Sequence, residues 1–176
     1  SLGRGETGWR VWLAMALCGL ALTIKQTTLF ESAFLGIWVL VALGRAGVAL
    51  PRLAGIALAC CAIGALPTLL VAGYYALAGH WYEFWHAMVI SNLQKQRPGG
   101  EAFRALGIGL RGAVLLAFAL WGLWSSRSGG DGRRFLACWI AAALVGFLSV
   151  PNFYSHYTLP VLVPLSVAAG LLFARH

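Results

Sequence analysis

Long apolar runs separated by short polar stretches dominate this chain. From Phe135 to Ala174, forty consecutive residues contain no Asp, Glu, Lys or Arg. A single helix of that length would measure about 60 Å at ~1.5 Å per residue, twice the ~30 Å core of a bilayer. The run therefore predicts two membrane spans joined by the polar, aromatic turn Pro151–Tyr157, where a membrane enzyme or transporter would keep its chemistry.

Six apolar segments predict an all-α fold, a polytopic transmembrane helix bundle of about six spans. Lys25 lies between the first two segments, which together are too long for one pass, so a turn at the lysine is favoured over a single tilted helix. Pro67 should kink the third segment because its ring removes a backbone donor. The expected spans are Trp9–Ile24, Leu29–Leu43, Leu53–Ala78, Leu106–Trp124, Phe135–Val150 and Thr158–Phe173.

The polar stretch from Gly79 to Arg104 carries an amphipathic pattern. Apolar side chains recur there at i, i+3, i+4, i+7 and i+8, which places them on one face of a helix. Such a helix is expected to lie in the membrane interface, in an external loop. Its apolar face comprises Trp81, Phe84, Trp85, Met88 and Val89.

Composition supports an integral membrane protein. Of the 176 residues, 60% are hydrophobic and only 10% are charged, and the mean hydropathy is +0.80. A soluble domain could not cover its surface with so few charges. The net charge of +8 does not indicate nucleic acid, since no recognition motif is present and most arginines lie in short loops. We expect residues 1–176 to form a single transmembrane domain, a fragment of a longer protein because the chain opens with Ser1 and shows no signal peptide.

The distribution of basic residues predicts the orientation. Alternating the six spans places eight arginines on one side and five basic residues on the other, most of the latter in one long loop. By the positive-inside rule the first side is cytoplasmic. The turn at Lys25, the loop from Gly79 to Arg104 and the turn Pro151–Tyr157 then share the external or lumenal face.

Lys25 is the first candidate for chemistry. A lysine between two apolar segments is costly unless an anion pairs with it, and a lipid phosphate would be such an anion, with Thr27 and Thr28 as hydroxyl donors. Alternatively the lysine snorkels to the headgroups and only marks the turn. Glu31 would act as a base or cation ligand, or it would pair with Lys25 or face water at the start of its helix.

His156, flanked by Tyr154 and Tyr157, is the second candidate. An imidazole between phenols can hydrogen-bond a phosphate or a sugar hydroxyl and can move protons near neutral pH. The same three residues would also suit an aromatic belt at the membrane surface. We predict no metal site, because His80, Glu83 and the four cysteines fit no ligand spacing.

Two stretches resemble a known family. Gly19–Gln26 resembles the GLAxxxKQ segment, and Phe153–Leu165 the FYxHYxLxLxPxL segment, of the bacterial GT-C glycosyltransferases related to the aminoarabinose transferase and the protein O-mannosyltransferases. The segment from Ala78 to Asn92 is similar to the external loop of that family. The resemblance covers most of the chain in order and corresponds to the C-terminal transmembrane portion of such an enzyme.

The resemblance implies transfer of a sugar from a polyprenyl-phosphate carrier to an acceptor on the external or periplasmic face of the bacterial inner membrane. Lys25 and Gln26 would then contact the carrier phosphate, while Tyr154, His156 and Tyr157 would line the cavity near donor or acceptor. The implied partners are the lipid-linked donor and membrane lipids. The acceptor and the cofactor stay open, a divalent cation in the full-length enzyme being one candidate.

The chain departs from the family in one respect. The family's catalytic carboxylate lies in the first external loop, upstream of this chain, and Asp131 is placed on the cytoplasmic side, so we assign no catalytic residue here and expect the 176 residues alone to be inactive. Two other classes stay open. One is a transporter or channel segment with Lys25, Glu31 and His156 along a substrate or proton path. The other is a membrane subunit without catalysis.

The predicted orientation can be measured with reporter fusions. A periplasm-active phosphatase fused after Gly79 should be active, and one fused after Arg45 should be inactive, because the two positions lie on opposite sides of the third span. A cytoplasm-active reporter at the same positions is the control and should give the opposite pattern. Activity of the phosphatase at Arg45 would reverse the orientation.

Overall fold

The computed structural model describes residues 7–91, 94, 99–125, 130–149 and 158–173. Within these residues all regular secondary structure is helical, and no strand is present, so the all-α prediction is confirmed. The chain divides into two compact units, Ser1–Gln96 and Arg97–His176.

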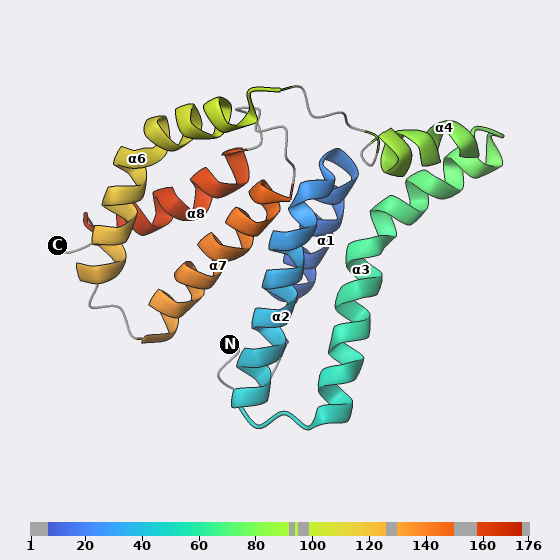
Figure 1. The fold of residues 1–176 in the computed structure, drawn as a ribbon. Coiled ribbons are helices and arrows are strands. Elements are labelled where there is room, and N and C mark those ends of the chain that lie inside the picture. Colours follow the sequence, from blue (N-terminus) through green and yellow to red (C-terminus); the bar gives the residue numbers. More distant parts are fainter. Residues whose placement is uncertain (1–6, 92–93, 95–98, 126–129, 150–157, 174–176) are drawn as a thin grey trace. The chain divides into compact units, whose positions relative to one another are not determined.

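The first unit is built on three long helices, shown in Figure 1. They are α1 (Trp9–Ile24), α2 (Leu29–Arg45) and α3 (Leu50–Leu77). The chain reverses direction between α1 and α2, because Lys25 is extended (φ −148°, ψ 112°) and is followed by the short 3-10 helix η2 (Gln26–Thr28). The helix break predicted at Lys25 is therefore present.

Pro67 and Gly79 determine the path of the chain along α3 and beyond its end. Pro67 lies inside α3, and Figure 1 shows that α3 bends along its length, as expected where a proline removes a backbone donor. Gly79 ends the helix with a positive φ of 78°, which glycine adopts without strain. The chain then turns into the short helix α4 (Trp81–Trp85), followed by η3 (His86–Ile90), which is a π-helix.

Aromatic rings cluster around α4. Trp81 stacks on Trp85 with ring centroids 6.1 Å apart, and the Phe84 ring lies 5.6 Å from Trp81 and 5.8 Å from Tyr75 of α3. The segment is helical, as an α-helical turn continued by a π-helical one, and its amphipathic character stays a prediction. Its position in a membrane interface stays a prediction.

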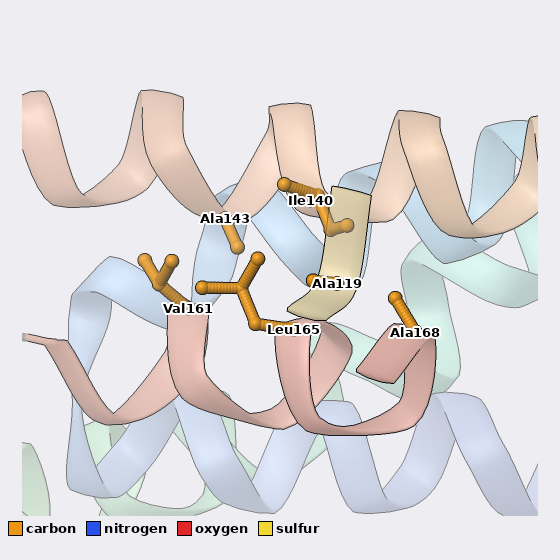
Figure 2. Close-up of a cluster of buried hydrophobic side chains, with 6 residues drawn as sticks. All are labelled: Ala119, Ile140, Ala143, Val161, Leu165 and Ala168. Atoms are coloured by element: carbon orange, nitrogen blue, oxygen red, sulfur yellow. The ribbon is translucent and has the colours of Figure 1, made fainter. Parts of the chain in front are cut away.

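The second unit comprises α6 (Glu101–Ser125), α7 (Gly130–Leu148) and α8 (Leu159–Gly170). Its core is apolar, and Figure 2 shows side chains from the three helices meeting there. Small residues contribute half of this core, which allows the helices to approach closely. The core residues are Ala119, Ile140, Ala143, Val161, Leu165 and Ala168.

Three helices among the described residues are long and apolar enough to cross a membrane: Gln26–Arg45, Leu50–Leu77 and Phe103–Ser125. Large apolar side chains such as Ile24 (87% exposed) and Leu77 (93% exposed) lie on the surface rather than in a core. This arrangement indicates a membrane protein, in which lipid covers the outer face. Trp9–Ile24 and Leu159–Gly170 are apolar but shorter, so six spans stay a prediction.

Each unit contains one very close approach of two helix backbones. A Cβ added at Gly19 of α1 would collide with the carbonyl oxygen of Gly64 and lie 3.0 Å from Cδ of Pro67, both on α3. A Cβ at Gly122 of α6 would likewise collide with the carbonyl oxygen of Ala168 on α8. Membrane helices associate through such small-residue contacts, because the lipid supplies no hydrophobic driving force between them.

These contacts predict that a Gly→Ala substitution lowers stability at a closely packed glycine and raises it at a glycine that faces open space. Gly19→Ala and Gly122→Ala should lower stability by roughly 1–3 kcal/mol through overpacking. Gly73→Ala and Gly109→Ala should raise it by up to about 1 kcal/mol, because a Cβ there meets nothing within 4 Å and alanine favours the helix. Thermal unfolding in detergent measures all four. Equal effects at the two kinds of glycine would contradict the close packing.

Candidate functional site

The turn that carries Lys25 is held by its own backbone. The amide of Lys25 donates to the carbonyl of Ala21 at 2.8 Å, and the carbonyl of Lys25 accepts from the Thr28 amide at 3.2 Å. The Thr28 hydroxyl donates to the same carbonyl at 2.7 Å. That proton is therefore used inside the turn, so the prediction that the Thr28 hydroxyl donates to a phosphate is not supported.

The lysine itself is partly buried among its neighbours. Burial lowers the pKa of Lys25 from its ordinary value, and the Glu31 carboxylate opposes this shift by favouring the ammonium. The structural role considered for Glu31, a charge partner of Lys25, thus has an electrostatic basis. Removal of a lysine from water is unfavourable, and an added anion beside it would stabilise the charged form.

Thr27, in the same turn, carries a buried hydroxyl. Its Oγ1 is inaccessible to solvent and has no hydrogen-bond partner among the described residues. A buried hydroxyl of this kind loses a hydrogen bond to water on folding, which is unfavourable.

Gln26 connects the turn to the segment beyond α3. Its Nε2 donates to Sδ of Met88 in η3 at 3.1 Å, although 62 positions separate the two residues in the sequence. Two of the three features predicted to share one membrane face, the Lys25 turn and the segment after Gly79, therefore meet in the structure.

A cavity of about 580 Å³ lies between α1, α2 and α3, and both Gln26 and Met88 line it. Two glycines, Gly36 and Gly64, contribute to the space because they project no side chains. A Cβ at either position would make only ordinary contact, 3.9 Å from an atom of Met15. The volume is typical of a small-molecule or lipid-chain site.

The cavity is lined mainly by apolar side chains. Its three polar lining side chains, Gln26, Ser32 and Thr68, belong to the parts of the chain nearest the Lys25 turn, and we call this end the polar end. Along α3 the lining runs from Ala57 to Thr68, about 16 Å at ~1.5 Å per residue. Toward Ala57 the wall is apolar, with Leu40 and Met15 contributing. A mainly apolar cavity with a few polar groups at one end suits a molecule with a long apolar chain and one polar end.

The other sequence-predicted residues lie elsewhere. Tyr154, His156 and Tyr157 fall outside the described residues. Asp131 is exposed in the first turn of α7, 3.6 Å from Nη1 of Arg134. Asp131 lies at one end of α7, and the residues around His156 follow the other end in the sequence.

His80 and Glu83 are exposed, with Nδ1 and Oε1 3.6 Å apart. This spacing allows an ion pair when the imidazole is protonated. Among the described residues, no group of three His, Cys, Asp or Glu side chains is placed to hold a metal ion.

Sequence reasoning missed the cavity and the role of Met88. Met88 was expected only on the apolar face of an interfacial helix, and its contact with Gln26 depends on the bend of α3 and the turn at Gly79. The sequence feature that could have indicated the cavity is the pair of glycines Gly36 and Gly64, which leave space on facing helices. The two glycines point to a cavity only when it is known which helices pack together.

Comparison of the chain with protein families, with curated proteins and with solved structures finds no match.

Proposed function

We propose that this chain is the transmembrane part of a membrane glycosyltransferase that takes a sugar from a polyprenyl-phosphate carrier. The observation that carries the proposal is the cavity of the first unit, which is mainly apolar and is lined at one end by Gln26, the residue that follows Lys25. A prenyl chain would fill the apolar part, and its phosphate would lie at the polar end. The resemblance of Gly19–Gln26 to the GT-C glycosyltransferases supports the same assignment.

Lys25 supplies the charge that such a phosphate requires. Its partial burial weakens its interaction with water, so a phosphodiester beside it would gain more from pairing than it would from a fully exposed lysine. Gln26 lines the cavity next to it and offers amide donors to the phosphate oxygens. Glu31 balances the charge of Lys25 when no lipid is bound.

Tyr154, His156 and Tyr157 contribute to the donor or acceptor site in this proposal, on the basis of the resemblance. The transfer takes place on the external face of the bacterial inner membrane, in the synthesis of the cell envelope. The carboxylate that activates the acceptor comes from outside these 176 residues, so the full-length protein is the enzyme and the fragment alone is inactive.

Substitution of Lys25 tests the phosphate contact. In the full-length protein, Lys25→Ala should reduce sugar transfer from a polyprenyl-phosphate donor at least about tenfold, the loss expected for one charged hydrogen bond. Lys25→Arg should retain part of the activity because the charge remains. Radiolabelled transfer in membranes measures both, with expression checked by immunoblot.

The matched control is Arg52→Ala. Arg52 is an exposed basic residue in the first turn of α3, at the end of that helix far from the Lys25 turn. Its transfer rate should equal that of the wild type. Normal transfer by Lys25→Ala would assign Lys25 to headgroup snorkelling. No transfer by the wild type with any such donor would overturn the proposed function in favour of a transporter or a subunit without catalysis.

A substitution that fills the cavity tests whether the prenyl chain of the donor binds there. Gly36→Leu should place a side chain in the space lined by α1, α2 and α3 and raise the apparent KM for the lipid donor about tenfold or more. The fold should persist, because a Cβ at Gly36 meets only Met15 Sδ at 3.9 Å. Gly73→Leu, whose Cβ meets nothing within 4 Å, is the control and should leave KM unchanged. An unaltered KM in Gly36→Leu would exclude this cavity as the donor site.

A further inference from the structure

We infer that the segment Trp81–Ile90 acts as a lid over the polar end of the cavity and that the Gln26–Met88 hydrogen bond holds this lid closed. Both side chains line the cavity, and they belong to segments on either side of its polar end. Their contact, 3.1 Å from Nε2 to Sδ, joins the wall made by the Lys25 turn to the segment that follows α3.

The chemistry of this contact suits a closure that opens readily. A thioether sulfur is a weak acceptor, so the bond to Gln26 is weaker than one to a carbonyl oxygen would be. The Met88 side chain is also unbranched and adaptable, and it can leave or refill a gap with little strain. This weak hydrogen bond therefore breaks before the packed helices that form the cavity wall separate.

The attachment of the segment favours movement as a unit. It follows Gly79, whose positive φ of 78° marks a tight turn at the end of α3. Its residues Trp81, Tyr82 and Trp85 are exposed, so few buried contacts hold α4 in place. The ring contact between Phe84 and Tyr75, at 5.8 Å, fixes α4 to α3, and the hydrogen bond from Gln26 attaches Met88 to the Lys25 turn.

The π-helical turn is a second reason to expect that this segment moves. Residues His86–Ile90 form a π-helix directly after the α-helical turn of α4. A π-helix is a less favourable arrangement than a continued α-helix, and π-turns often occur at functional sites. Relaxation of this turn toward an α-helix would rotate Met88 relative to α4 and separate its sulfur from Gln26.

In the proposed function, the lid controls how a prenyl phosphate reaches the cavity. This inference rests on the proposed function only for the identity of that ligand. The closure itself is a property of the unliganded protein and can be tested without any donor or transfer assay, so each proposal can fail independently of the other.

The test measures access of a water-soluble thiol reagent to Cys60, a buried residue of the cavity wall. The full chain, with Cys60 as its only cysteine, is placed in phospholipid vesicles and treated with a charged methanethiosulfonate. Met88→Leu retains the approximate volume but removes the acceptor, whereas Met88→Gln replaces the sulfur by a stronger oxygen acceptor.

Met88→Leu should raise the labelling rate about fivefold, and Met88→Gln should lower it by a similar factor, as expected for loss and gain of one hydrogen bond. The same substitutions in a protein whose only cysteine replaces Arg52, an exposed residue in the first turn of α3, control for general loosening and should leave its labelling unchanged. Opposite shifts at Cys60 alone would support the lid. Equal rates in the three proteins, or a rise in both variants, would overturn it.

Discussion

The contact of two helix backbones at Gly19 holds the first unit together. A bilayer offers no hydrophobic driving force between apolar helices, so α1 and α3 must gain their stability from close packing of atoms. The missing side chain at Gly19 allows the carbonyl of Gly64 and the ring of Pro67 to approach. Everything described around Lys25 follows from this contact, because it sets how the end of α1 lies against α3.

The same small residues create both contact and space. Gly19 lies against Gly64 where α1 meets α3, and Gly64 and Gly36 both leave room in the cavity. The cavity is therefore the part of a three-helix unit that glycines prevent from filling. Its polar end coincides with the helix break at Lys25, because the extended lysine and the 3-10 turn after it interrupt the apolar surface. Gln26 of this turn lines the cavity, and Lys25 precedes it directly in the sequence.

The sequence predicts the elements of this protein better than their interactions. Apolar runs located the helices, and Lys25 marked a real break, because a charged side chain, a glutamine and two threonines interrupt the hydrophobic pattern. The pattern could not show that the Thr28 hydroxyl donates to a carbonyl within the turn. A threonine at this position is equally compatible with a local hydrogen bond and with a contact to a ligand. Nor could it show Gln26 beside Met88, because that contact depends on the direction in which the chain leaves Gly79. The residues of the Pro151–Tyr157 turn stay known from the sequence alone.

The pairing of α1 with α3, and of α6 with α8, also has a consequence for biosynthesis. In each unit the helix that makes the tightest backbone contact is separated from its partner by another helix, and it leaves the ribosome first. During synthesis α1 has no Gly64 or Pro67 to pack against until α3 has been made. Its 16 residues are short for a span and are followed by a lysine, so until then α1 lacks the close backbone contact that holds it against α3. The first unit is thus completed in the membrane only when its third helix arrives.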